Sequence, residues 1–491
     1  MKLYSEDTNY KLYQGNMLDM LEVIESNSID SIVTDPPYGL TSITKRFGKE
    51  SSAPAQYGTD GSFNRLCKGF MGKEWDGSGI EYNVDAWKKC YEVLKPGGYL
   101  LAFGGTRTFH RIACAIEDAG FEIRDTIMWL YGSGFPKSMN IGLAIDKKNG
   151  VESEVGGIKP GHEDFVNRKT DGHMKFADGM DGFDRPWMHD SEKRESYHYQ
   201  KVPTSNLAKQ WDGWGTALKP SYEPIIVARK PLEGTCVDNV LKYGVGGINI
   251  DECRIGTEEV VTNGKGGLSN PEIYGNFSKS GISLNSIHQG RFPANTILTY
   301  DETDEQEVCG GFPDTKGNAH ERFRTENNVY SGKTSGGIRQ NDCWGDEGSA
   351  SRYFYCAKAS KKDRDEGLDR FEDGNITDGR KAISDRPYLR KETIRKNNHP
   401  TVKPTELMQY LIRLVTPNGG TVLDPFNGSG STGKAVMWEN KERNKNYSYV
   451  GIELDDSYLE ISKARIDYAI KCSLYPEQTA SKPKAKCKKL F

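Results

Sequence analysis

The feature that most constrains the fold lies near the end of the 491-residue sequence. Residues 421–433 read TVLDPFNGSGSTG, in which an apolar strand ends at Asp424 and a GxGxxG run beginning at Gly428 opens a helix. Glycines at such a junction let the backbone turn tightly and approach a ligand, because no Cβ occupies that space. Glu453 ends the next predicted strand, where a carboxylate can accept hydrogen bonds from both hydroxyls of a ribose. The pattern predicts a site for an adenosine-type cofactor, with a purely structural glycine turn as the alternative.

The position of this unit indicates that the strands of the sheet come from distant parts of the chain. A nicotinamide-binding Rossmann domain needs further βαβ units after the acid, and the sequence ends at residue 491. The remaining strands must therefore come from earlier residues. Apolar runs that fit strands lie at 11–13, 31–34, 99–103, 223–228 and 449–452, and helical spacing of apolar residues lies at 84–94, 109–119 and 407–415. Together they predict an α/β fold with a buried, mostly parallel sheet.

A second motif, Asp35-Pro36-Pro37-Tyr38, directly follows the predicted strand 31–34. Two prolines stiffen the turn and remove two N–H donors, which leaves carbonyl oxygens without local partners. Such acceptors suit an exocyclic amine of adenine or cytosine. The carboxylate of Asp35 and the carbonyl of Pro36 can hold its two hydrogens and aim the lone pair at an electrophile, while Tyr38 stacks on the ring. A turn with a structural role only is the alternative.

Composition narrows the classes of function. The sequence lacks an apolar run of the roughly 18 residues that a membrane span needs, and its start lacks a secretory signal. The ten cysteines are scattered with no CxxC pair, so we expect reduced thiols of a cytoplasmic protein and no metal site. A formal charge of −3 neither requires nor excludes a polyanionic partner. Five lysines within residues 481–491 fit either a tail that contacts phosphates or a solubilising terminus.

In this order, the two motifs resemble those of the β-class DNA amino-methyltransferases that use S-adenosylmethionine, in which the catalytic motif precedes the cofactor motif. The resemblance implies that Asp35, Pro36, Pro37 and Tyr38 form the catalytic motif. It also implies that the cofactor is bound by Asp424, Pro425, Phe426, Asn427, Gly428 and Gly430, with Glu453 on its ribose.

Two further cofactor contacts are implied by the same resemblance. Residues 399–404, HPTVKP, are similar to the N-terminal cofactor segment of the family, so Lys403, Pro404 and Thr405 would border the methionine carboxylate at a helix N-terminus. The family usually has a Gly-Asp pair before the catalytic motif, in contact with the adenine amine of the cofactor. Here Gly15-Asn16 stands in that place, and Asn keeps the acceptor oxygen without the charge. Asn16 is the expected counterpart, and Asp19 is the alternative.

The fold that the resemblance implies is a Rossmann-like methyltransferase fold, circularly permuted, with a mostly parallel seven-stranded sheet and an inserted target-recognition domain. Residues 99–103 would form a central strand, and 123–130 with 223–228 an antiparallel hairpin. The predicted parts are a catalytic part (1–131), a polar insert (132–215), a hairpin strand of the same domain (216–235), a target-recognition domain (236–398), a cofactor-binding part (399–470) and a basic tail (471–491).

The implied activity is site-specific methylation of adenine N6 on a base that is flipped out of duplex DNA. Asp-Pro-Pro-Tyr accompanies adenine more often than cytosine in this family, and cytosine N4 remains the alternative. Methylation of RNA or of a protein amide, and a DNA-binding module without activity, are further alternatives. The expected partner is double-stranded DNA, in the cytoplasm of a bacterial or phage-infected host. The sequence leaves open a homodimer and a cognate restriction endonuclease.

Overall fold

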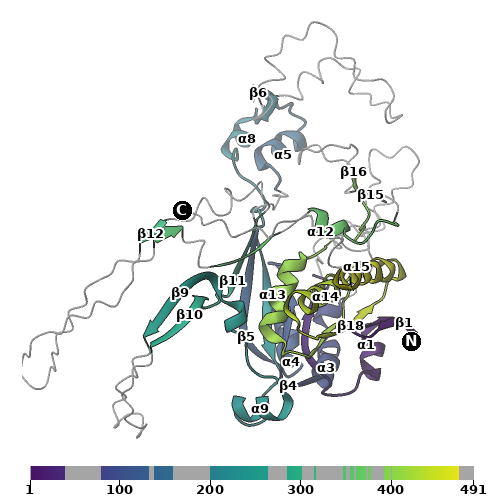
Figure 1. Ribbon diagram of the computed structural model, residues 1–491. Coiled ribbons are helices and arrows are strands. Elements are labelled where there is room, and N and C mark those ends of the chain that lie inside the picture. The colour runs from purple at the N-terminus through teal and green to yellow at the C-terminus, as the bar shows by residue number, and fades with distance from the viewer. Residues whose placement is uncertain are drawn as a thin grey trace, which may run out of the picture. The chain divides into compact units, whose positions relative to one another are not determined.

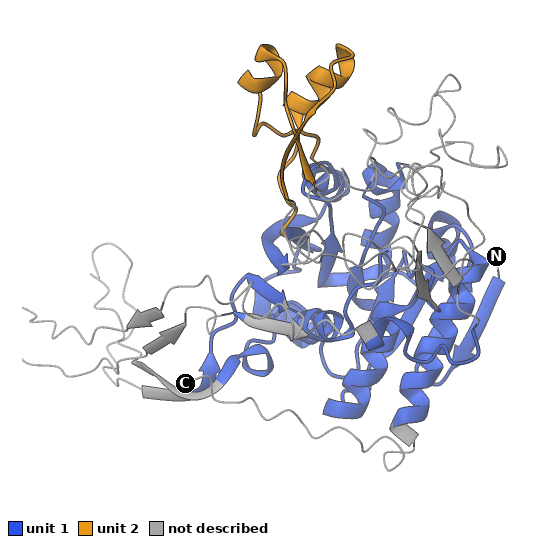
Figure 2. Ribbon diagram, turned by 90° about the horizontal axis from the view of Figure 1, so that it is seen from above, with its two compact units in different colours: residues 1–132, 222–491 blue, residues 133–221 orange. Residues whose placement is uncertain are grey.

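The chain divides into two compact units, one of residues 1–132 with 222–491 and one of residues 133–221 (Figure 2). The computed structural model describes residues 2–38, 79–131, 138–158, 199–263, 285–300, 314–316, 347–349, 354–358, 361–371, 374–377, 392–399 and 401–474. Most of the predicted basic tail, 471–491, therefore lies outside the described residues. No helix within these ranges has the length and apolar character to cross a membrane.

A single large sheet runs through the larger unit (Figure 1). In order across this ten-stranded sheet, the strands are β1 (Lys2–Asp7), β2 (Tyr10–Gln14), β18 (Ser448–Glu453), β17 (Thr421–Asp424), β3 (Ile29–Thr34), β4 (Leu94–Phe103), β8 (Tyr222–Arg229), β5 (Glu122–Tyr131), β11 (Thr296–Tyr300) and β14 (Tyr355–Lys358). β1 is antiparallel to β2, and β8 is antiparallel to both of its neighbours, whereas the other adjacent pairs are parallel. A mostly parallel α/β sheet is therefore confirmed.

The number of strands differs from the seven that the resemblance implied. The run from β2 to β5 supplies seven strands, including the expected antiparallel pair of β5 and β8, and β1, β11 and β14 extend the sheet at its two edges. β1 was not predicted because its residues are partly or fully exposed and lack an apolar run. β11 and β14 were not predicted as strands of this sheet because they lie within 236–398, which we expected to form a separate domain. The circular permutation itself stays a prediction.

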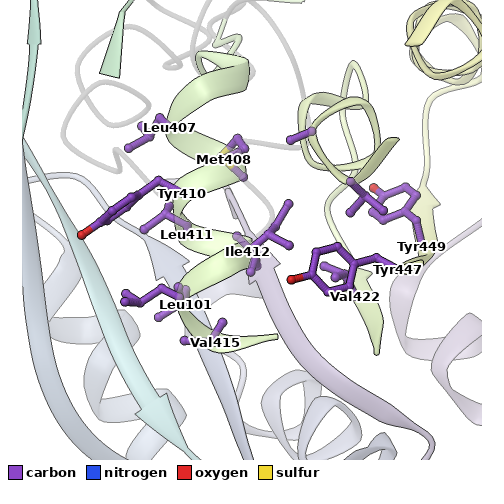
Figure 3. Close-up of a cluster of buried hydrophobic side chains, with 14 of the residues drawn as sticks. Leu101, Leu407, Met408, Tyr410, Leu411, Ile412, Val415, Val422, Tyr447 and Tyr449 are labelled. Carbon is purple, nitrogen blue, oxygen red and sulfur yellow. The ribbon is translucent and has the colours of Figure 1, made fainter. Parts of the chain in front are cut away.

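Alternate residues of β4 enter two different hydrophobic cores. Leu101 and Phe103 pack into a cluster with α13 (Thr405–Val415), α14 (Ser431–Arg443) and α15 (Asp456–Leu474), and Figure 3 shows Leu101 beside α13. Leu100 and Ala102 pack into a second cluster with α1 (Met17–Met20), α3 (Val84–Val93) and α4 (Phe109–Asp118). Helices thus cover both faces, which explains why the predicted central strand 99–103 is continuously apolar.

The strand order brings the two sequence motifs together. β17 lies between β18 and β3, and Leu423 of β17 pairs with Ile32 of β3. Because these strands are parallel, their carboxyl ends meet at the same edge of the sheet, where ligands bind in open α/β sheets. The turn Asp35-Pro36-Pro37-Tyr38, which we predicted to be catalytic and call the catalytic turn, follows β3. The glycine loop follows β17, so both begin at this edge.

The described part of residues 236–398 is joined to the larger unit. Its remaining elements are α9 (Cys236–Tyr243), α12 (Lys361–Asp365), the hairpin of β9 (Ile255–Asn263) and β10 (Asn285–Arg291), the hairpin of β12 (Asp314–Lys316) and β13 (Glu347–Ser349), and the hairpin of β15 (Gly374–Thr377) and β16 (Glu392–Arg395). Short 3-10 turns cover Leu21–Val23, Ile80–Tyr82 and Asp251–Cys253. The predicted boundaries of the target-recognition domain stay a prediction.

In the smaller unit, residues 133–221, the described residues form two short helices and a hairpin. These are α5 (Ile141–Lys148), α8 (Asn206–Gln210) and the antiparallel pair of β6 (Glu154–Ile158) and β7 (Tyr199–Val202). Buried Asp146 of α5 accepts hydrogen bonds from the Thr204 backbone N–H (2.6 Å) and the Ser205 hydroxyl (2.5 Å). This carboxylate therefore joins α5 to the start of α8.

Candidate active site

One cavity of about 460 Å³ lies at the carboxyl edge of the sheet and collects most of the predicted site residues. Its volume falls in the range of roughly 300–1,000 Å³ that is typical of small-ligand pockets. The predicted residues that line it are Asn16, Asp35, Pro36, Pro37, Tyr38, Lys403, Asp424, Pro425, Phe426, Asn427, Gly428 and Glu453. Pro404, Thr405 and Gly430 are absent from this lining. The catalytic turn and the glycine loop therefore share one cavity.

Asp424 joins the two motifs directly. Its carboxylate accepts hydrogen bonds from the hydroxyls of Thr34 and Thr432, each at 2.6 Å, and from the backbone N–H of Phe426 at 3.1 Å. Thr34 immediately precedes Asp35, which we predicted to be catalytic, and lies 390 positions from Asp424 in the sequence. Burial raises the pKa of Asp424 to about 6. Asp424 was predicted to bind the cofactor, and these contacts show that it also fixes the end of β3 against the glycine loop.

The glycine loop is held against the ribose-binding acid predicted from the sequence. The backbone N–H of Gly428 donates to one carboxylate oxygen of Glu453 at 2.7 Å, and the N–H groups of Leu454 and Asp455 donate to the other at 2.9 Å. The oxygen that accepts from Gly428 retains a further lone pair for a ligand hydroxyl, whereas the other oxygen already accepts two hydrogen bonds. Burial raises the pKa of Glu453 to about 7, and the backbone N–H groups oppose this rise.

Asn427 and Gly430 fix the glycine loop against β18 and α15. The Asn427 side-chain oxygen accepts hydrogen bonds from the hydroxyls of Tyr449 (2.8 Å) and Ser462 (3.2 Å). Gly430 adopts φ +74°, and a Cβ there would lie 2.3 Å from the Ser462 hydroxyl oxygen. Gly430 thus lets the loop pack closely on α15, and Gly430 itself does not line the cavity.

Asn16 lies beside Glu453 at the cavity wall. The backbone N–H of Gly15 donates to the Glu453 carbonyl at 2.9 Å, and the Asn16 side chain caps α1 by accepting from the Leu18 N–H at 3.0 Å. The alternative, Asp19, is exposed on α1 and is not among the lining residues. Of the two candidates, the geometry places Asn16 at the cavity and Asp19 away from it.

Four side chains of the catalytic turn and its surroundings form a connected cluster, which we call the Asp35 cluster. The Lys403 ammonium donates to Asp35 Oδ2 at 2.6 Å and to the Tyr38 hydroxyl at 3.1 Å. The Tyr38 hydroxyl donates to Glu223 Oε2 at 2.9 Å, and the same oxygen is 3.5 Å from Lys403 Nζ. Asp35 Oδ1 is buried and has no hydrogen-bond partner among the described residues. One oxygen of Asp35 is therefore satisfied by protein, and the other is not.

The electrostatics of this cluster follow from burial and from its charges. Burial raises the pKa of Asp35, Lys403 opposes this rise, and Glu223 adds to it. Burial opposes the charge of Lys403, yet the neighbouring Asp35 and Glu223 carboxylates hold its pKa above the ordinary value. Burial and the Asp35 charge raise the pKa of Tyr38 well above its usual range, so its hydroxyl keeps its proton.

Comparison with known proteins gives the family. Residues 29–464 match the N6/N4 family model described as DNA methylase. The chain belongs to this DNA methylase family. It is 23% identical over 257 residues to the type II methyltransferase M.HindIII of Haemophilus influenzae, covering 48% of this chain and 64% of that protein. It is 32% identical over 87 residues to the DNA adenine methyltransferase YhdJ of Escherichia coli K12, covering 18% of this chain and 28% of that protein.

The sequence identity to a solved structure is lower. The cytosine-N4-specific PvuII DNA methyltransferase is 12% identical, with a TM-score of 0.36 and coverage of 96% of each chain. The methylase described here spans less than two thirds of the length of the two curated relatives above.

The cavity of this methylase fits S-adenosylmethionine. Glu453 lies at the carboxyl end of β18 and presents a partly buried carboxylate where a ribose binds in this type of fold. A Cβ on Gly428 would meet the His399 ring at 2.8 Å, so only glycine leaves the loop in this conformation. Phe426 and Asn16 line the same cavity. The described residues contain no cluster of three or more His, Cys, Asp or Glu side chains that could hold a metal ion.

The structure shows protein partners of Lys403 and Thr405 that the sequence did not predict. Lys403 lines the cavity and donates to Asp35, and its predicted contact with the methionine carboxylate of the cofactor stays a prediction. The N-terminus of α13 is occupied by a protein carboxylate: Asp363 accepts from the Thr405 N–H at 2.8 Å and from its hydroxyl at 2.6 Å. Asp363 also accepts from the fully buried Lys434 at 2.6 Å. A helix N-terminus attracts a carboxylate, and here α12 supplies it.

Glu223 is the main site residue that the sequence analysis missed. It is the second residue of β8, and its register partner is Trp129 of β5. An acid at the start of an otherwise apolar strand was the available signal, because strand ends line the ligand edge of such a sheet. His399 also lines the cavity, and burial lowers its pKa to about 3, so its ring is neutral at physiological pH.

Proposed function

We propose that this methylase transfers a methyl group from S-adenosylmethionine to adenine N6 at specific sites in duplex DNA. The observation that carries the proposal is Asp35 Oδ1, a buried acceptor without a partner among the described residues, in the cavity that also holds the glycine loop and Glu453. An unsatisfied buried acceptor is unfavourable by roughly 1–3 kcal/mol. A donor that arrives with the substrate relieves this penalty, and an exocyclic amine is such a donor.

The mechanism follows from the acceptors at the turn. Asp35 Oδ1 and the Pro36 carbonyl accept the two amine hydrogens, which directs the nitrogen lone pair into the cavity. S-adenosylmethionine supplies an electrophilic methyl group when bound. As the N–C bond forms, the bond between the methyl carbon and the sulfonium sulfur breaks and leaves S-adenosylhomocysteine as a neutral thioether. The nitrogen becomes cationic and loses one proton to Asp35. The target base is flipped out of the duplex because its amine is otherwise hidden in the stack.

Adenine is favoured over cytosine by two observations. The motif begins with Asp35, as in the adenine enzymes that the sequence resembles, and the E. coli relative is a DNA adenine methyltransferase. A nucleoside assay tests the choice: duplex DNA is incubated with the protein and S-adenosylmethionine, digested and examined by mass spectrometry. We expect N6-methyladenine. N4-methylcytosine without N6-methyladenine would reverse the assignment, and transfer to RNA or protein without transfer to DNA would exclude the DNA substrate.

We propose that the compact unit 133–221, together with 236–398, contributes to recognition of the DNA. The chain leaves the sheet at the end of β5 for this unit and returns at Tyr222, directly before Glu223 of the Asp35 cluster. The unit exposes Trp211 and Trp214, whose rings lie 5.2 Å apart. Aromatic side chains and exposed lysines are the residue types that contact nucleic acids. A cytoplasmic location fits this substrate, and a homodimer and a cognate restriction endonuclease stay predictions.

Affinity for the cofactor should depend on the ionisation of Glu453. A ribose hydroxyl donates best to the charged carboxylate, and the pKa of Glu453 is raised to about 7. Lowering the pH below this value protonates Glu453, so we expect affinity for S-adenosylhomocysteine to fall by up to about tenfold per pH unit. Isothermal titration calorimetry between pH 5.5 and 8.5 measures this slope. E453Q is the control, because any slope that it retains belongs to the ligand or to another group such as Asp424, whose pKa is about 6. Equal slopes in both proteins would contradict the role of Glu453.

A further inference from the structure

Glu223 connects two parts of the Asp35 cluster that are supplied by different elements. Its Oε2 accepts from the Tyr38 hydroxyl at 2.9 Å and lies 3.5 Å from the ammonium of Lys403. Lys403 in turn donates to Asp35 at 2.6 Å. Glu223 lines the cavity. The Lys403 ammonium thus lies between the Glu223 carboxylate of β8 and the Asp35 carboxylate, which accepts the hydrogens of the amine in the proposed mechanism.

We propose that Glu223 is a positioning residue for methyl transfer: it holds the Tyr38 ring through its hydroxyl and shares Lys403 with Asp35. The proposal rests on the function proposed above and deepens it. Lys403 is held between two carboxylates, so neither carboxylate alone determines where its ammonium lies. Because Lys403 occupies Oδ2 of Asp35, Oδ1 is left without a partner among the described residues.

The charges around the cluster suit a reaction that places a positive charge on the base. Asp35 and Glu223 are two carboxylates that share one ammonium, and the hydroxyl of Tyr38 is neutral. In a buried site, an excess of negative charge stabilises the cation that develops on the base. The Asp35 carboxylate accepts the proton that is released. Without the Glu223 charge, the Lys403 ammonium would form an ion pair with Asp35 alone.

The groups that face Asp35 come from four elements. Lys403 precedes α13, Tyr38 belongs to the turn itself, Glu223 begins β8, and Asp424 ends β17 and interacts with the Asp35 charge. Glu223 in addition faces Tyr131 of β5, whose pKa burial and Glu223 raise to about 12. Lys403 also faces neutral His399. Among these groups, Glu223 and Asp424 are the acids whose charge opposes ionisation of Asp35.

The topology explains how β8 brings this acid to the cavity. β8 is antiparallel to its neighbours, so its first residues, and not its last, lie at the carboxyl edge of the sheet. Its partner β5 contributes Trp129 opposite Glu223. The reversed strand therefore brings an N-terminal residue to an edge that the parallel strands reach with their carboxyl ends.

The test is the pH profile of single-turnover methyl transfer to duplex DNA by E223Q. Glutamine keeps the acceptor for the Tyr38 hydroxyl and removes the charge. The acidic limb of this profile is the range in which the rate rises with pH. We expect the limb of E223Q to lie at lower pH than that of the wild type, because Asp35 ionises more readily without the Glu223 charge. We expect E223A to show the same displacement and, in addition, a maximal rate reduced by about tenfold, because Tyr38 loses its acceptor.

Two further variants separate this role from a structural one. E122Q removes an acid from the opposite end of the β5–β8 pair, where Glu122 bonds Arg229, and should leave the limb in place. Y38F keeps the charge of Glu223 and removes a hydrogen bond that lowers the pKa of Asp35, so its rate should fall without the movement of the limb to lower pH that E223Q shows. An unmoved limb in an active, folded E223Q protein would overturn the proposal. If the wild-type protein transfers no methyl group to DNA, the proposed function fails instead.

Discussion

Replacing Asp35 with asparagine is expected to reduce the rate of methyl transfer by at least about 10³-fold. Asparagine has nearly the same shape, but it presents one acceptor oxygen where aspartate presents two. The ammonium of Lys403, now 2.6 Å from Asp35 Oδ2, selects the amide oxygen. The amide NH₂ then occupies the place of Oδ1 and faces the amine of the base, donor against donor. Asparagine also cannot take the proton that the methylated nitrogen releases.

The defect should lie in the transfer step and not in the binding of cofactor. Rapid-quench measurement with tritiated S-adenosylmethionine gives the rate, and calorimetry with S-adenosylhomocysteine gives the affinity, which should change little because Glu453 and the glycine loop are intact. D19N is the matched control: Asp19 is exposed on α1 and does not line the cavity. If D35N retained a tenth of the wild-type rate, Asp35 could not be the principal acceptor of the amine.

The arrangement of the fold could be predicted from local sequence because each motif marks its own place in a sheet. A parallel strand that ends in a glycine loop or an acceptor-rich turn must present it at the carboxyl edge. Asp35 and Gly428, which lie far apart in the chain, could therefore be expected in one cavity, and both line it. The bond of Thr34 to Asp424 then follows from the adjacency of β3 and β17.

The partners of Lys403 and Thr405 could not be predicted from the same reasoning. Spacing along one segment places a lysine near a helix start, but it does not state which carboxylate arrives there from elsewhere. Asp363 reaches the start of α13 from within a segment whose composition indicates only loops and short strands. Glu223 reaches Tyr38 because β8 reverses direction. Both contacts depend on tertiary pairing, which leaves a weak signal in composition.

Gly428→Ala is expected to weaken binding of the cofactor by about 100-fold. Gly428 adopts φ +50°, and its added Cβ would lie 2.8 Å from the His399 ring nitrogen Nε2. A left-handed conformation is unfavourable by roughly 1–2 kcal/mol for an alanine, and the contact with His399 adds to that penalty. The loop therefore relaxes away from Glu453 in the free protein, and binding must restore it. Calorimetry with S-adenosylhomocysteine measures the loss.

The steric part of this effect can be separated from the conformational part by two comparisons. Gly419 adopts φ +78° with no atom within 4 Å of an added Cβ, so G419A carries the backbone strain without the clash and should leave cofactor affinity unchanged. His399 is buried with its ring 4.6 Å from that of Tyr458, so the ring cannot move aside. Removing it should relieve the clash, and the loss of affinity in H399A/G428A should be smaller than the sum of the two single losses. Additive losses would show that the strain at Gly428, and not its approach to His399, explains why glycine is required.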